Sequence, residues 1–118
     1  MTRSFRNLAI IVAAAWALLP AAGVSANPTV NVVASNWKFT PSTIELHVGQ
    51  TTTLRLTSSE GVHGLQSDEL GIPLTTIAPG AAKAVTVTAK KPGTYVLHCA
   101  IMCGAGHANM TLTVNVVP

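Results

Sequence analysis

Apolar and polar residues alternate along several short stretches of this chain, and Gly or Pro residues separate the stretches. Residues 44–48 read Ile-Glu-Leu-His-Val, and residues 110–116 have the same two-residue period. A period of two is typical of β-strands that have one buried face. The pattern therefore predicts strands whose inward residues are Ile44, Leu46, Val48, Leu54, Leu56, Met110, Leu112, Val114 and Val116.

Further strands are expected where β-branched residues cluster between turn signals. Residues 30–34, 84–89 and 94–98 are such stretches, whereas residues 65–80 are irregular and predict a long connection. No stretch after residue 26 makes a convincing helix. Regularly spaced strands with Gly/Pro turns indicate an all-β protein, a single antiparallel β-sandwich.

The first 26 residues predict an export signal. Arg3 and Arg6 precede an apolar run from Leu8 to Leu19, and Val24-Ser25-Ala26 resembles a cleavage site. The run is shorter than the roughly 20 residues that span a bilayer, so cleavage is favoured over an uncleaved anchor. We therefore expect a signal peptide at 1–26 and one exported domain at 27–118. It would lie in a periplasm or on the outer face of the cytoplasmic membrane. It would contact the membrane only if the N-terminal segment remained uncleaved.

Charge gives no reason to expect a nucleic-acid partner. The chain of 118 residues has seven basic and four acidic residues, but Arg3 and Arg6 belong to the predicted signal. The remaining domain is nearly neutral, and no basic stripe is interleaved with aromatic residues. Hydrolytic chemistry is equally unsupported, because no nucleophile elbow or Ser-His-Asp order is present.

The chemistry is concentrated between His98 and Met110. This stretch has the spacing Cys99-x₃-Cys103-x₃-His107-x₂-Met110. Thiolate, imidazole and thioether are soft ligands that select copper over calcium or magnesium, and structural zinc sites seldom include methionine. A mononuclear blue-copper site needs a single Cys, so the second thiol suggests a centre in which two thiolates bridge two copper ions.

Other interpretations of the two thiols are a structural disulfide, which is common in exported domains, and a mononuclear blue or red copper site with Cys99 spare. The disulfide would leave His107 and Met110 unexplained. A second histidine ligand has to come from elsewhere in the chain, and His63 is the best candidate.

The order of these residues resembles a known family. Val62-His63-Gly64, residues 69–73 (Glu-Leu-Gly-Ile-Pro) and the loop from Cys99 to Met110 are similar to the CuA domain of cytochrome c oxidase subunit II. The likeness extends from about residue 36 to 117 and is strongest for short subunits II, which have counterparts of residues 36–41 and of Val48-Gly49.

The resemblance implies a Greek-key, cupredoxin-like sandwich with a dinuclear CuA centre that carries single electrons. It implies the metal ligands His63, Cys99, Ile101, Cys103, His107 and Met110, with Ile101 contributing only its backbone carbonyl. It also implies redox partners such as a c-type cytochrome or a terminal oxidase, to which the chain would belong as a subunit II-like component. Larger members of the family often have a glutamate at the position of Ile101, and its side chain helps to build a magnesium site against the main oxidase subunit. This chain lacks that glutamate.

The alternative from another class is a periplasmic protein that binds Cu(I) through the same sulfur atoms for delivery or tolerance. For the neighbouring residues, we expect Trp37 and Phe39 to fill the core and His98 to be exposed near the site. Met102 would form an apolar lip for a docking partner or simply pack.

Overall fold

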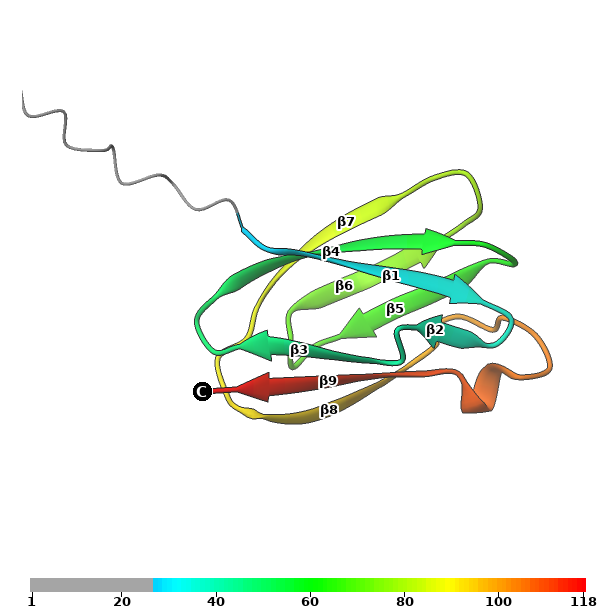
Figure 1. The fold of residues 1–118 in the computed structure, drawn as a ribbon. Coiled ribbons are helices and arrows are strands. Elements are labelled where there is room, and N and C mark those ends of the chain that lie inside the picture. The colour runs from blue at the N-terminus through cyan, green and yellow to red at the C-terminus, as the bar shows by residue number, and fades with distance from the viewer. Residues whose placement is uncertain (1–26) are drawn as a thin grey trace, which may run out of the picture.

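The computed structural model describes residues 27–118, so the predicted signal segment at 1–26 lies outside the described residues. Nine strands and one short 3₁₀ helix follow in the described part (Figure 1). Their bounds are β1 Thr29–Ser35, β2 Lys38–Thr40, β3 Thr43–His47, β4 Thr51–Ser58, β5 His63–Ser67, β6 Ile72–Ile77, β7 Lys83–Thr88, β8 Gly93–His98, η1 His107–Asn109 and β9 Thr111–Val117. Within residues 27–118 we find no helix with the length and apolar character of a membrane span.

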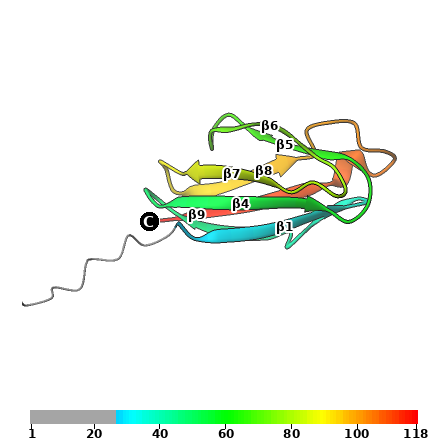
Figure 2. The same ribbon diagram turned by 90° about the horizontal axis from the view of Figure 1, so that it is seen from above.

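The strands form two facing sheets and a separate hairpin. One sheet has the order β2-β1-β4-β7, the other has the order β3-β9-β8, and β5 pairs with β6. The hairpin contacts the edge strand of each sheet, since β6 lies against β7 and β5 lies against β8 (Figure 2). The predicted all-β, cupredoxin-like sandwich is therefore confirmed.

Two strand pairs run parallel, which the alternation pattern alone did not predict. β1 pairs with β4 and β3 pairs with β9 in parallel, while the other pairs are antiparallel. The chain leaves the first sheet after β2 and returns to it as β4, so β4 arrives beside β1 in the same direction. Alternation identifies the buried face of a strand, but it contains no information about the direction of the partner.

The core lies between the two sheets and consists of the residues that the alternation assigned inward. All nine are buried except Val48, which is half-buried. Each fully buried Leu, Val or Met side chain stabilises the fold by roughly 1.5–3 kcal/mol through removal of apolar surface from water. The sandwich is thus a rigid support for the loops at its ends.

Residues 65–80 were expected to form a long connection, and this prediction was wrong. They contain most of the β5–β6 hairpin, with an irregular register between Leu65 and Ser67. Only the two end residues of β6 are buried, and Pro73 is its second residue, so β6 lacks the alternation that marks a half-buried strand.

The two aromatic residues near β2 have different environments. Phe39 is buried in the core as expected. The prediction for Trp37 was wrong, because its side chain is 40% exposed in the turn between β1 and β2.

Candidate metal centre

All six predicted ligand residues lie at one end of the sandwich. His63 is the first residue of β5, and Cys99 directly follows β8. The loop between β8 and β9, drawn in orange at the right of Figure 1, contains the other four: Ile101, Cys103, His107 and Met110. Antiparallel pairing of β8 with β9 brings the two ends of this loop together, and the Cys99 N–H donates to the Met110 carbonyl at 3.0 Å.

His63 has one ring nitrogen held by the backbone and one without a partner. Its side chain is fully buried, and Nε2 lies 2.8 Å from the Glu60 carbonyl oxygen. A carbonyl only accepts, so Nε2 is the donor and the lone pair of the neutral ring is on Nδ1. Nδ1 is buried and has no hydrogen-bond partner among the described residues. An imidazole held in this way is oriented as a metal ligand, since ligating histidines usually donate their other N–H to such a group.

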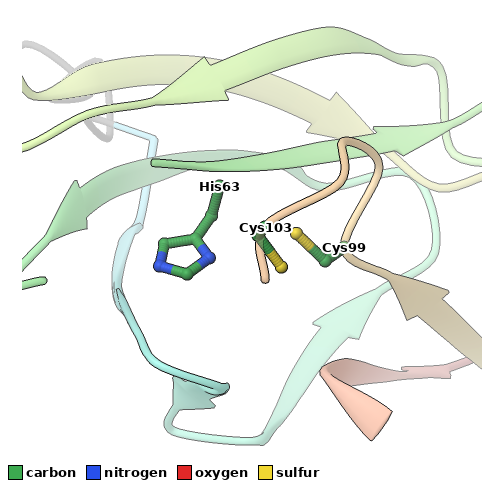
Figure 3. A group of neighbouring side chains, drawn as sticks. All are labelled: His63, Cys99 and Cys103. Atoms are coloured by element: carbon green, nitrogen blue, oxygen red, sulfur yellow. The ribbon is translucent and has the colours of Figure 1, made fainter. Parts of the chain in front are cut away.

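His63 faces both cysteines. One ring nitrogen of His63 and the Sγ atoms of Cys99 and Cys103 all lie within 4.8 Å of one another, and Figure 3 shows the three side chains together. Cys99 is 3% exposed and Cys103 is half-buried, and both are free thiols. The Cys99 thiol donates to the Ile101 carbonyl at 3.3 Å. This geometry supports metal binding over the disulfide interpretation.

Cys103 connects this group with the remaining two donors. Its Sγ lies 3.4 Å from His107 Nδ1 and 3.7 Å from Met110 Sδ. The turn that follows Cys103 begins with Gly104 at φ 119°, a value that non-glycine residues rarely adopt. Next, η1 positions His107, whose N–H donates to the Gly104 carbonyl at 3.1 Å. Five side-chain donors and the Ile101 carbonyl therefore converge on one region.

The thiol of Cys103 is protonated at neutral pH in the metal-free protein. Burial raises its pKa from 9.0 to about 11, and the neighbouring Cys99 thiol adds to the rise. A metal ion that binds here has to displace this proton, because the thiolate is the ligand form.

The cysteine loop is also held against β5. The Ala100 N–H donates to the Gly64 carbonyl at 2.9 Å. A Cβ on Gly64 would lie 3.0 Å from Ile101 Cγ2 and 3.2 Å from Ile101 N, which is closer than ordinary packing permits. Glycine directly after His63 therefore allows the loop to approach the histidine.

Two residues beside the site were not recognised from the sequence as partners of the predicted ligands. Glu60 accepts from His63 through its carbonyl, and the Trp37 indole N–H donates to the Cys103 carbonyl at 2.9 Å. A backbone acceptor has no residue signature, and Trp37 is 66 positions from Cys103. His98 is exposed, as expected. Met102, within the ligand loop, is 80% exposed, so it does not pack into the core.

The donor set suits copper better than other biological metals. Two thiols, two imidazoles and a thioether are soft or borderline ligands, and the side chains that converge here include no carboxylate. Calcium and magnesium prefer oxygen ligands, and a tetrahedral zinc site would leave the thioether without a role.

Comparisons with known proteins agree with this assignment. The model of the family described as "Cupredoxin-like domain" matches residues 7–114. Cytochrome c oxidase subunit 2 of Thermus thermophilus is 34% identical over 104 residues, which cover 86% of this chain and 76% of the relative. A second subunit 2 sequence from the same species is matched over 61% of its length, so the chain spans less than two thirds of that relative.

Solved structures show the same fold. A heme-copper terminal oxidase dimer is 25% identical with a TM-score of 0.67, over 77% of this chain and 65% of that chain. The periplasmic domain of cytochrome oxidase subunit II from Bradyrhizobium japonicum is 18% identical with a TM-score of 0.70, over 78% and 85% of the two chains. The fold, the sequence relationship and the converging donors lead to one conclusion: this chain belongs to the cupredoxin-like family, as a relative of the CuA domain of cytochrome c oxidase subunit II.

Proposed function

We propose that this chain is an exported carrier of single electrons with a dinuclear, thiolate-bridged copper centre of the CuA type. In this proposal Cys99 and Cys103 bridge two copper ions. His107 and Met110 complete the ligands of one ion, and His63 and the Ile101 carbonyl complete those of the other. A copper pair of this kind supplies a site that gains and loses one electron.

The observation that carries the proposal is the environment of His63. Its unpartnered, buried Nδ1 belongs to a ring that lies within reach of both thiols, while Nε2 is held by Glu60. A buried nitrogen without a hydrogen bond costs free energy, on the order of 1–3 kcal/mol, unless a ligand uses its lone pair. A copper ligand role for Nδ1 accounts for this arrangement.

The arrangement of the donor atoms around the two thiols supports a site for two copper ions. Cys103 contacts His107 and Met110, whereas Cys99 contacts the Ile101 carbonyl. His63 lies near both thiols. The site therefore offers two terminal sets, each with one imidazole and one weaker donor, on either side of a thiol pair. A mononuclear site would leave one imidazole and one thiol unused.

Burial favours an electron carrier over a copper-delivery protein. His63, Cys99 and Met110 are buried, and the loop ends are held by strand pairing. Ligands on a rigid support move little when the oxidation state changes, which suits electron transfer. Delivery of Cu(I) to an acceptor would instead need ligands that the acceptor can reach.

The relatives indicate where such a carrier would act. They are named as subunit II of cytochrome c oxidase or belong to the structure of a heme-copper terminal oxidase dimer, and one solved domain is named periplasmic. We therefore propose that residues 1–26 direct export and that the domain at 27–118 acts in the periplasm or on the outer membrane face. Its redox partners would be proteins such as a c-type cytochrome or a terminal oxidase, with the chain as a subunit II-like component.

Copper loading followed by metal analysis and paramagnetic resonance tests the proposal. The oxidised protein should bind two coppers per chain and give a seven-line hyperfine pattern, because one electron is shared between two copper nuclei. One copper with a four-line pattern would contradict the dinuclear centre. Retention of copper only in the reduced state, with ready transfer to a metal-free acceptor, would favour the delivery alternative.

A further inference from the structure

Trp37 lies outside the core but is in close contact with the ligand loop. Its side chain projects from the β1–β2 turn, which is at the same end of the sandwich as the β8–β9 loop (Figure 1). The indole N–H donates to the Cys103 carbonyl at 2.9 Å, although the ring is 40% exposed.

Gly106 shows how closely the ring approaches the loop. Its φ is −90°, a value that any residue can adopt, so its backbone conformation does not require glycine. A Cβ at this position would lie 2.5 Å from Trp37 Cγ and 2.7 Å from Trp37 Cβ, which is not sterically allowed. Trp37 is therefore the physical reason for glycine in the residue before His107.

The same turn contacts the histidine on the other side of the site. The Asn36 N–H donates to Glu60 Oε1 at 3.1 Å, and the carbonyl of Glu60 holds His63 Nε2 at 2.8 Å. A Cβ on Gly61 would lie 2.6 Å from Asn36 Oδ1, so the loop before His63 is pressed against the turn as well. Asn36 and Trp37 thus contact the two segments that contain the predicted ligands.

We infer that the Asn36–Trp37 turn is a bracket that sets the position of the Cys103–His107 loop relative to His63, with Trp37 as the positioning residue. Strand pairing connects Cys99 with Met110, but the middle of the loop, from Cys103 to His107, extends beyond the strands. Trp37 holds this middle part through one hydrogen bond and through close contacts with Gly104 and Gly106. Only the tests of this inference that use copper-loaded protein rest on the proposed function. The tests on metal-free protein do not depend on it.

The first experiment uses the metal-free, reduced full-length chain and does not depend on copper. Trp37→Phe keeps an aromatic ring but removes the N–H, so the loop should open more often and its thiols should react faster with a disulfide reagent. We expect a rate increase of roughly twofold to tenfold, the range that corresponds to one hydrogen bond. Leu74→Ala is the matched control, because Leu74 is 56% exposed on β6 and should leave the rate unchanged. Equal rates in the two variants and the wild type would overturn the bracket.

A double-mutant cycle tests the steric contact. Gly106→Ala should accelerate the thiol reaction in the wild-type background, because the new Cβ and the Trp37 ring cannot occupy the same space. In a Trp37→Ala background, Gly106→Ala should add little, because its obstacle is gone, and such non-additivity is the signature of a direct contact. Additive effects would show that Gly106 is required for a reason other than Trp37.

Copper-loaded protein separates positioning from simple structural support. Trp37→Phe should lower copper affinity by roughly 10- to 100-fold, as found for other residues that orient ligands, and should change the hyperfine pattern and the reduction potential. A cooperative thermal unfolding transition establishes that the variant is folded. If this folded variant has the affinity, spectrum and potential of the wild type, Trp37 is not a positioning residue. If wild-type protein has no dinuclear centre, the proposed function fails. The thiol reaction rates and the double-mutant cycle would still test whether the Asn36–Trp37 turn positions the loop.

Discussion

Replacement of Met110 by leucine separates the core packing of this residue from its proposed role as a copper ligand. Met110 is fully buried directly before β9, and its Sδ lies 3.7 Å from Cys103 Sγ. Leucine has nearly the same volume, and such volume-conserving changes cost less than about 1.5 kcal/mol. Alanine would leave a cavity and cost about 2–5 kcal/mol.

The backbone around Met110 should remain in place in the leucine variant. The Met110 N–H donates to the His107 carbonyl, and the Met110 carbonyl accepts from the Cys99 N–H. Neither contact involves the thioether. Leucine at this position should therefore leave Cys99, Cys103 and His107 positioned to bind two coppers, so that only the proposed thioether ligand would be lost.

Loss of this donor should raise the reduction potential. A donor stabilises the more positively charged, oxidised centre, so its removal favours reduction. Residues that only orient ligands already change metal affinity by roughly 10- to 100-fold, and tenfold corresponds to about 59 mV for a one-electron couple. We therefore expect a rise on the order of 60–120 mV, scaled from those values.

Voltammetry of the copper-loaded protein and thermal unfolding of the metal-free protein measure the two roles separately. At about 4–8 °C per kcal/mol, the leucine variant should unfold within about 12 °C of the wild type, and the alanine variant should lose more. An unchanged potential with both coppers bound would refute the ligand role of Met110. Loss of copper from the leucine variant would show that the thioether holds Cu(I) directly, as the delivery alternative requires.

Three further predictions concern the thiols and the contact with β5. Cys99→Ser should abolish the shared-electron spectrum and leave one copper at Cys103, His107 and Met110; an unchanged seven-line pattern would exclude Cys99 as a ligand. Gly64→Ala should destabilise the metal-free protein by about 1–3 kcal/mol in denaturant unfolding, because its Cβ would press on Ile101, and wild-type stability would contradict this contact. The stability of the metal-free protein should fall as pH rises from 9 towards 11, since the Cys103 thiol, with its pKa raised from 9.0 to about 11, loses its proton first in the unfolded chain. Cys103→Ser should remove this part of the pH dependence, and an identical pH profile would contradict it.

Local patterns in the sequence determined the strands with one buried face and the ligand-rich loop. Alternation at residues 44–48 and 110–116 depends only on the two-residue period of a strand, so it identified buried residues without knowledge of their partners. The spacing from Cys99 to Met110 is short enough that any turn linking two paired strands brings these donors close together. For this reason the donor chemistry of the loop was evident from composition and spacing.

Only the tertiary structure decided which distant segments meet. The parallel pairing of β1 with β4 and the β5–β6 hairpin depend on how the chain crosses between sheets, which no local pattern contains. His63 was the best candidate for the second histidine ligand, with much of the support coming from the resemblance, but its burial and its free Nδ1 arise from the Glu60 carbonyl and the approach of the loop to Gly64.

Trp37 illustrates the same limit. An aromatic residue in a strand-rich sequence is expected in the core, because burial of its ring is favourable in any fold. Its position over Gly106 and its hydrogen bond to Cys103 result from contacts across more than half of the chain. The sequence by itself thus determined which donors are present, and the packing of the β1–β2 turn, β5 and the β8–β9 loop determined how they are arranged.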